Sequence, residues 1–392
     1  MGFRILTLNS ISAKGLARLP RNRYEVAAGI ADPDAILVRS ADMHKVEIPA
    51  SVIAVGRAGA GTNNIPVAAL TQRGVPVFNA PGANANAVKE LVLAGLFLAA
   101  RHICESWQFV RELKGDAAAL ESAVEQGKKR FVGHELPGRT LGVVGLGAIG
   151  VEVANAAHLL GMHVLGFDPQ ITVQRAWQLS SGVEQAQSLE DLFARSDVVT
   201  VHVPLLDSTR SMVNARRIGR MRKGATILNF ARAAIVDEAD VLAALDSGKL
   251  AAYVCDFPTP KSKDHPGVVA LPHLGASTSE AEENSAMMVA DTLRDFLENG
   301  NIRHSVNFPE AALPRVPATD RIAIANSNVP NMVGQISTRL AEGGLNIADL
   351  LNKSKGGVAY TLIDIDGKVP AGLVERIADI QGVLSARAVQ GA

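Results

Sequence analysis

The glycine-rich segment Gly145-Leu146-Gly147-Ala148-Ile149-Gly150 constrains this chain more than any other feature. A short apolar run at 139–144 precedes it, and a helical stretch at 151–161, a second apolar run at 163–167 and Asp168 follow it. This is the order of a strand–turn–helix–strand unit with a G-x-G-x-x-G turn, which is typical of dinucleotide binding. The first glycine permits a tight turn, the second lets the backbone approach a pyrophosphate, and the third lets helix and strand pack closely.

The acid after the second predicted strand indicates which dinucleotide binds. Asp168 is expected to accept hydrogen bonds from the adenosine ribose hydroxyls, and its charge repels a 2′-phosphate, so the sequence predicts NAD rather than NADP. The pyrophosphate is expected at the start of the helix, where free N–H groups favour an anion. The candidate residues of this turn are Gly145, Gly147, Ala148, Ile149 and Gly150.

Composition limits the class of protein. A chain of 392 residues suggests two or three domains. It is 47% hydrophobic and only 4% aromatic, as expected for helices packed on parallel sheets. The formal net charge is zero and the one basic cluster, 128–130, is expected to be a solvated helix end, so nothing predicts a nucleic-acid partner.

The longest apolar run, 91–100, is half of what a bilayer requires, and the first residues lack the apolar region of a signal peptide. The two cysteines, Cys104 and Cys255, lack metal-ligand spacing and are predicted to be buried thiols in a reducing compartment. The sequence therefore predicts a soluble, cytoplasmic protein with no membrane span and no metal site.

Short apolar runs alternate with helical stretches, which predicts two doubly wound parallel-sheet domains of the α/β class. Strands are predicted at 3–8, 35–38, 52–55 and 75–78, and a long helix at 85–113 leads away from them. The alternation returns over 139–270, and a helix at 279–298 is expected to run back to the first domain. We predict a substrate-binding domain of residues 1–100 and 283–310, an NAD-binding domain of residues 101–282, and a hinged cleft.

Prolines 309, 314 and 317 predict a linker over 311–319. The last segment, 320–392, reads as strand, helix, two strands, helix and strand. Its predicted elements lie at 321–325, 332–343, 347–352, 358–365, 371–380 and 383–389. This βαββαβ order predicts a small ferredoxin-like domain.

An NAD enzyme that moves a hydride needs a general acid/base and a cation for the charge of its substrate. Arg232 follows a predicted strand, where a guanidinium can grip a carboxylate with two parallel bonds. His273 follows another, and its ordinary pKa suits proton exchange with a hydroxyl. Glycine and small residues surround His273, as a close cofactor requires. His202 ends a third strand and is expected to line the cofactor with backbone at 202–204.

A second glycine-rich turn, Gly56-Arg57-Ala58-Gly59-Ala60-Gly61, lies in the first domain. Successive backbone N–H groups in such a turn can form an anion nest, and Arg57 adds a cation beside it. A phosphorylated hydroxy acid fits this charge pattern. The alternative is a turn with a purely structural role.

Together these segments resemble the D-isomer-specific 2-hydroxyacid dehydrogenases over nearly the whole chain. The resemblance is carried by 56–59, the dinucleotide turn, Ala231-Arg232 and the run Pro272-His273-Leu274-Gly275-Ala276-Ser277-Thr278. It implies that Arg232 binds the substrate carboxylate and that His273 is the acid/base. It also implies that NAD is lined by Asp168, His202, Val203, Pro204, Thr209, Phe230, Ala231, Asp256, Gly275 and Ala276. Substrate contacts are expected from Arg57, Ala58, Gly59, Asn84, Asn86 and Lys89.

The resemblance is closest to family members that oxidise 3-phospho-D-glycerate to 3-phosphohydroxypyruvate with NAD, the first step of L-serine biosynthesis. Two alternatives remain at this point: a dehydrogenase of another D-2-hydroxyacid, and a catalytically silent regulator that binds NAD and an amino acid. The resemblance also implies a homodimer or homotetramer.

One departure from the family pattern concerns His273. The family usually has Asp-Val-Phe followed by acidic residues and a proline, and one of those glutamates orients the histidine. Here the chain reads Asp256-Phe257-Pro258-Thr259-Pro260-Lys261, with no glutamate. We predict an active enzyme whose acid/base has a lower pKa than the family norm, because a carboxylate partner raises the pKa of an imidazole. Either His273 works unaided or another acid replaces the glutamate, the candidates being Glu280, Glu282 and Glu283.

The tail resembles an ACT domain at Asn328-Val329-Pro330-Asn331-Met332-Val333. This resemblance implies that L-serine binds across paired tails, held by Asn328 and Asn346, with Asn326 where some relatives have histidine. Asn331 replaces a usual glycine, which is tolerable because Asn accepts positive φ. The alternative is a tail that only oligomerises.

Overall fold

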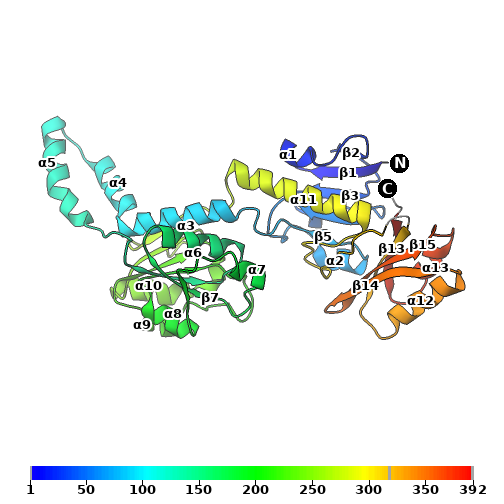
Figure 1. The fold of residues 1–392 in the computed structure, drawn as a ribbon. Helices are drawn as coiled ribbons and strands as arrows, with labels where there is room; N and C mark the ends of the chain where they lie inside the picture. Colours follow the sequence, from blue (N-terminus) through cyan, green and yellow to red (C-terminus); the bar gives the residue numbers. More distant parts are fainter. Residues whose placement is uncertain (1, 317–318, 390–392) are drawn as a thin grey trace. The chain divides into compact units, whose positions relative to one another are not determined.

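The computed structural model describes residues 2–316 and 319–389. Residues 317–318 of the predicted linker, including Pro317, and residues 390–392 of the predicted tail lie outside the described residues. The chain forms two compact units, one of Met1–Asn84 with Ser279–Ala392 and the other of Ala85–Thr278. Figure 1 shows the elements of each unit.

The first unit contains a five-stranded parallel sheet in the order β2-β1-β3-β4-β5. The predicted strands at 3–8 and 35–38 are confirmed, whereas the predicted strand at 52–55 begins two residues later. β2 was not predicted, because only one of its four side chains is buried and it lies at the sheet edge. The elements are β1 (Phe3–Leu8), α1 (Ala13–Leu16), β2 (Tyr24–Ala27), β3 (Ala35–Val38), η1 (Met43–Lys45), β4 (Ala54–Arg57), α2 (Val67–Gln72) and β5 (Val77–Phe78).

The second unit contains a seven-stranded parallel sheet in the order β12-β11-β10-β9-β6-β7-β8. The strand order reverses between β6 and β9, and ligands of such sheets bind beyond the carboxyl ends of the strands at this point. The strands are β6 (Thr140–Val144), β7 (His163–Phe167), β8 (Val183–Gln185), β9 (Val198–Val201), β10 (Ala225–Asn229), β11 (Leu250–Cys255) and β12 (Val268–Ala270). The two-domain α/β class predicted from the sequence is confirmed.

Helices cover this second sheet and extend from it. They are α3 (Ala85–Ala100), α4 (Ile103–Glu112), α5 (Ala117–Gly127), η2 (Lys128–Phe131), α6 (Ala148–Leu159), α7 (Val173–Ala176), α8 (Leu189–Arg195), α9 (Ala215–Arg220), η3 (Ala233–Ile235) and α10 (Glu238–Asp246). The basic cluster lies in η2 and is exposed, as predicted. Cys255 is buried, but Cys104 on α4 is only partly buried, so the prediction of two buried thiols is wrong for Cys104.

The predicted long helix at 85–113 is two helices. The Ala100 carbonyl accepts a hydrogen bond from His134 N (2.9 Å) instead of continuing the helix, and His102 adopts a left-handed conformation with φ 50°. α3 buries Val88, Val92 and Leu96 in the core of the second unit. The unit boundary therefore lies at 84/85 and 278/279, rather than at the predicted 100/101 and 282/283.

The tail is a four-stranded antiparallel sheet in the order β14-β15-β13-β16 with two helices, the ferredoxin-like arrangement predicted. Its elements are β13 (Thr319–Ser327), α12 (Met332–Glu342), β14 (Ile347–Lys355), β15 (Val358–Asp366), α13 (Leu373–Ala378) and β16 (Val383–Val389). Asn331 has φ 64°, which confirms the positive φ expected for this residue.

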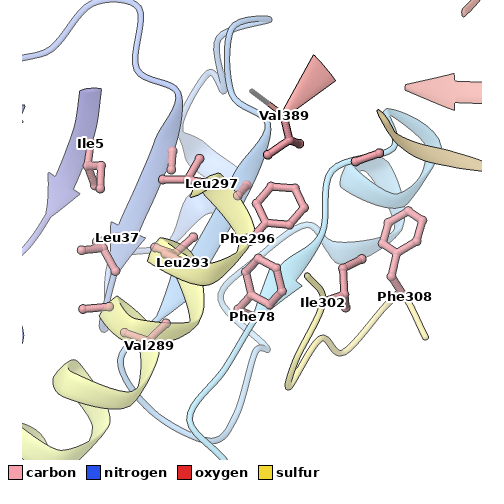
Figure 2. Packing of buried hydrophobic residues seen from close by; sticks show 14 of the residues in the cluster. Ile5, Leu37, Phe78, Val289, Leu293, Phe296, Leu297, Ile302, Phe308 and Val389 are labelled. Atoms are coloured by element: carbon pink, nitrogen blue, oxygen red, sulfur yellow. The ribbon is translucent and has the colours of Figure 1, made fainter. Parts of the chain in front are cut away.

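Helix α11 (Ser279–Asn299) returns to the first unit, as predicted, and its buried face shares a core with the tail. Figure 2 shows Val289, Leu293, Phe296 and Leu297 of α11 within the cluster that also contains Val389 of β16. This apolar contact explains why the tail and the first sheet form one compact unit.

The tail also caps the carboxyl end of α11, whose last carbonyls have no partner within the helix. Arg387 donates to the Phe296 and Leu297 carbonyls, Arg321 to Asn299 O (3.0 Å), and Tyr360 to Gly300 O (2.8 Å). Arg321 is fully buried and makes a two-bond ion pair with Asp364.

None of the helices in the described part of the chain is both long and apolar enough to span a bilayer. Within residues 2–316 and 319–389, no group of three or more His, Cys, Asp or Glu side chains is placed to hold a metal ion.

Candidate active site

The glycine-rich turn between β6 and α6 has the geometry that a dinucleotide needs. Gly145 has φ 90°, a conformation that side chains disfavour. A Cβ at Gly150 would lie 1.9 Å from Gly145 O, so the helix packs on the turn only because Gly150 has no side chain. Nothing lies within 4 Å of a Cβ position at Gly147, which leaves the start of α6 open to a phosphate. Ala148 and Ile149 form the first turn of this helix.

Asp168 directly follows β7, and two backbone N–H groups hold its side chain beside this turn. Its Oδ2 accepts Leu146 N (2.9 Å) and its Oδ1 accepts Gln170 N (2.9 Å). Each carboxylate oxygen has a further lone pair, so the side chain can still accept ribose hydroxyls. The residues of the turn and Asp168 thus fit the predicted NAD.

His202 follows β9, and its carbonyl lies against the turn, 2.6 Å from where a Gly145 Cβ would be. Its Nε2 hydrogen-bonds Thr200 Oγ1 (2.9 Å), and burial lowers its pKa to about 4, so the imidazole is neutral at pH 7. Val203 and Pro204 follow, and Thr209 donates to the Pro204 carbonyl (2.6 Å). This bond closes a loop beside the dinucleotide turn.

The side chain of Asn229 shapes the turn that presents Arg232. Asn229 is fully buried at the end of β10; its Oδ1 accepts Ala231 N (3.2 Å) and its Nδ2 donates to Arg232 O (3.0 Å). Arg232 is exposed, and Nη1 donates to the Ala231 carbonyl (2.7 Å). The remaining guanidinium donors can therefore take a substrate carboxylate.

Phe230 is 6% exposed, and its ring lies 3.1 Å from a Cβ position at Gly95 of α3. Its ring therefore belongs to the core of the second unit.

Asp256 directly follows β11 and is 1% exposed. Its Oδ2 accepts Gly275 N (2.9 Å), while its Oδ1 is buried with no partner in the described part of the chain. An unpaired buried acceptor is costly, and the amide group of a nicotinamide would satisfy it. The bond to Gly275 also fixes the loop that carries His273 and Ala276.

His273 is exposed and has φ 55°, an uncommon conformation for a residue other than glycine. Its ring packs against that of Phe257 with a centroid distance of 5.2 Å. Arg232, Asp256 and His273 follow β10, β11 and β12, which are neighbours in the sheet. The second unit thus brings a cation, a buried acceptor and an imidazole to one sheet edge.

The three acids proposed as partners of His273 lie on α11 in the first unit. Glu282 pairs with Arg39, Glu283 pairs with Lys14 (2.7 Å), and Glu280 accepts from Ser279 Oγ (3.0 Å).

The turn at 56–61 differs from the predicted anion nest. Ala58 N donates to Val38 O at the end of the neighbouring strand β3, and Gly59 N donates to Arg57 O within the turn, both at 2.8 Å, so these two N–H groups are already used. Arg57 Nε donates to Arg39 O (3.1 Å). The expected nest therefore lacks the N–H groups of Ala58 and Gly59.

The remaining candidates have local partners. Asn86 donates to Glu90 Oε1 (2.8 Å) and accepts from Lys89 on α3, whereas Asn84 ends the first segment of the other unit. In the tail, Asn328 donates to Gly356 O (3.0 Å) and Asn346 to Asp366 Oδ2 (2.7 Å). Asn326 is 1% exposed, and its Oδ1 has no partner among the described residues.

Sequence reasoning missed the positioning role of Asn229 and the contact of Phe257. The sequence carries a partial signal for both, since Asn229 ends β10 and Phe257 lies two residues after β11, at the sheet edge where Arg232 and His273 lie.

The chain matches known proteins along most of its length. Residues 93–275 match the D-isomer specific 2-hydroxyacid dehydrogenase NAD-binding domain. The chain is 33% identical to D-3-phosphoglycerate dehydrogenase of Haemophilus influenzae, over 87% of this chain and 82% of that one. It is 34% identical to the enzyme of that name from Methanocaldococcus jannaschii, over 84% of this chain but 61% of that longer one.

Solved structures agree with this. D-mandelate dehydrogenase of Rhodotorula graminis has a TM-score of 0.67 at 25% identity, covering 80% of this chain and all of that one (100%). NAD+-bound 3-phosphoglycerate dehydrogenase of Entamoeba histolytica has a TM-score of 0.59 at 25% identity, covering 78% of this chain and 99% of that one. The chain therefore belongs to the D-isomer specific 2-hydroxyacid dehydrogenases and is an NAD-dependent oxidoreductase.

Proposed function

We propose that the protein oxidises 3-phospho-D-glycerate to 3-phosphohydroxypyruvate, the first step of L-serine biosynthesis. The observation that carries this proposal is the set of Arg232, Asp256 and His273 at the ends of three neighbouring strands beside a dinucleotide turn. The choice of substrate is supported by the relatives named D-3-phosphoglycerate dehydrogenase, at 33% and 34% identity.

In this mechanism Arg232 grips the substrate carboxylate through the guanidinium donors that its turn leaves available, which orients C2. The His273 imidazole takes the proton of the C2 hydroxyl as general base. When bound, NAD would supply the acceptor for the hydride that leaves C2. Asp256 holds the His273 loop through Gly275, and its Oδ1 would accept from the nicotinamide amide.

The first unit is proposed to bind the rest of the substrate, and the second to bind NAD. Arg57 is proposed to contact the substrate phosphate, with Ala58 and Gly59 beside it. Asn84, Asn86 and Lys89 are further proposed substrate contacts.

The tail is proposed to act as an ACT-type sensor of L-serine, using Asn326, Asn328 and Asn346. The buried, unpaired Oδ1 of Asn326 supports a polar ligand at this end of β13. Isothermal calorimetry tests this part: heat on adding L-serine supports it, and no heat with the full chain removes it.

The protein is also proposed to be cytoplasmic and to form a homodimer or homotetramer. Helix α4 supports self-association, because none of its residues is buried and Ile103, Trp107 and Val110 are exposed along it.

The activity is tested by following NADH oxidation with 3-phosphohydroxypyruvate, beside glyoxylate, pyruvate and 2-oxoglutarate. The proposal predicts fast turnover of the phosphorylated acid. Turnover of an unphosphorylated acid alone would leave the mechanism in place and remove the assigned substrate, while oxidation of none of the four would favour a catalytically silent regulator.

A further inference from the structure

The imidazole of His273 lacks a carboxylate partner within its own unit. No ion pair or hydrogen bond joins either ring nitrogen to an acidic side chain in Ala85–Thr278, a segment that the structure describes completely. The nearby carboxylate of Asp256 is directed to Gly275 N instead (2.9 Å). The usual means of orienting such a histidine is therefore absent here.

The acids on α11 are already engaged. Glu282 and Glu283 form ion pairs with Arg39 and Lys14, and the Glu280 carboxylate accepts from the hydroxyl of Ser279. Recruiting any of them to an imidazole would require breaking an interaction inside the first unit.

The ring of Phe257 contacts the His273 ring instead. The two ring centroids are 5.2 Å apart and the planes are tilted by 57°, which is within the favourable range for aromatic pairs. Such a contact restricts the side-chain rotamers of a residue that otherwise lies exposed.

Both halves of this contact are fixed by the backbone. Phe257 directly follows the buried Asp256, and Pro258 after it restricts Phe257 to an extended conformation. The bond from Gly275 N to Asp256 Oδ2 joins the segment of Phe257 to the loop of His273 (2.9 Å). His273 has φ 55°, so the loop needs such support to stay in this conformation.

We propose that Phe257 is a positioning residue, which orients the His273 imidazole for proton transfer in place of the missing glutamate. The inference rests on the proposed function, since it concerns the acid/base of that reaction. The Phe257 ring carries no charge, so it can hold the His273 ring in one orientation without forming an ion pair with it.

Kinetics test this role with two variants. Phe257→Leu removes the ring face while keeping an apolar side chain, and Phe257→Tyr keeps the ring. We expect kcat with 3-phosphohydroxypyruvate to fall about three- to tenfold in Phe257→Leu, as for loss of one aromatic pair, and to return in Phe257→Tyr. The Kd for NADH should stay within about twofold, and the solvent deuterium isotope effect on kcat should increase because proton transfer becomes slower.

The carboxylate alternative is tested in the same assay. Glu280→Gln, Glu282→Gln and Glu283→Gln should each keep kcat within about threefold of the unmodified protein. A loss of about a hundredfold in any one of them would assign the orienting role to that acid and overturn the proposal. So would a kcat and isotope effect in Phe257→Leu equal to those of the unmodified protein.

NMR separates this inference from the proposed function, because it needs no turnover. With histidine labelled with carbon-13, the His273 ring signal is identified by its loss in His273→Asn. The ring current of Phe257 should shift that signal, so it should move in Phe257→Leu and stay close to its original place in Phe257→Tyr. An unchanged signal in Phe257→Leu would remove the contact. A shifted signal in a protein inactive on all four acids would remove the function and leave the contact standing.

Discussion

The side chain of Asn229 holds the backbone around Arg232 in place. Its Nδ2 donates to the Arg232 carbonyl at 3.0 Å, and its Oδ1 accepts from the Ala231 N–H at 3.2 Å. A buried amide at the end of β10 thus determines the direction in which the guanidinium leaves the sheet. A buried side chain has the same role after β11, where Asp256 holds the loop of His273 by accepting a hydrogen bond from Gly275 N. Both proposed catalytic groups are exposed side chains that depend on a buried neighbour.

Asn229→Ala is expected to weaken substrate binding more than NADH binding. The change leaves the Ala231 N–H and the Arg232 carbonyl without partners, so the turn loosens and the KM for the oxo acid rises by about tenfold or more. Steady-state kinetics and fluorescence titration with NADH measure the two effects. An equal loss in both, with a lower melting temperature, would indicate general unfolding of this edge instead.

Gly147 and Gly150 provide a matched pair of substitutions. Gly147→Ala should fold as before, because its Cβ meets nothing within 4 Å, yet it should lose NADH affinity by blocking the pyrophosphate. Gly150→Ala should lower the melting temperature as well, because its Cβ would lie 1.9 Å from a backbone oxygen. Normal NADH affinity in Gly147→Ala would argue against a pyrophosphate at this helix.

Asp256→Asn tests the unpaired buried acceptor. The new side chain can still accept from Gly275 N through its oxygen, but it then presents an NH₂ group where Oδ1 was. A nicotinamide amide would meet a donor instead of an acceptor, so the Kd for NADH should rise by about tenfold with little loss of stability. Unchanged affinity would show that Oδ1 does not contact the cofactor.

The stability of the second unit should fall in acid because of His202. Burial lowers the pKa of His202 to about 4, against an ordinary value near 6.5. Below pH 6.5 the His202 imidazole binds a proton in the unfolded chain but stays neutral in the folded chain. The contribution of His202 to the free energy of unfolding is therefore complete above pH 6.5 and is lost as the pH falls to 4. Urea unfolding between pH 7 and 4.5 measures this loss.

His202→Asn should reduce that acid sensitivity. His163→Asn, which changes an exposed histidine on β7, is the control and should retain it. The same dependence on pH in all three proteins would place the acid sensitivity elsewhere.

Tyr360→Phe tests the cap that the tail gives to α11. The variant leaves the buried Gly300 carbonyl without its 2.8 Å hydrogen bond, and we expect the free energy of unfolding to fall by about 1–3 kcal/mol. A stability equal to that of the unmodified protein would mean that water replaces the hydroxyl.

The sequence predicted the dinucleotide turn, both α/β sheets and the ferredoxin-like tail, because glycine spacing and apolar runs are local signals. It could not predict that the helix breaks after Ala100. The break depends on a hydrogen bond from His134 N to the Ala100 carbonyl, and His134 lies more than thirty residues further along the chain. The edge strand β2 was missed because it buries a single side chain.

At the site, the sequence pointed to Arg232 and His273 by position, but not to what orients them. Phe257 and His273 follow two different strands that only the folded sheet brings together, and the bond of Asn229 to Arg232 depends on the local shape of the turn after β10. The sequence also could not show that two N–H groups of the expected nest over 56–61, those of Ala58 and Gly59, already donate to Val38 O and Arg57 O.

The most direct test of the account is single-turnover oxidation of bound NADH by His273→Asn. As acid/base, His273 should contribute a factor of about 10²–10⁴, so the variant should bind NADH normally and transfer hydride to 3-phosphohydroxypyruvate slower by that factor. Transfer within tenfold of the unmodified protein, at equal NADH affinity, would contradict the account by showing that another group moves the proton.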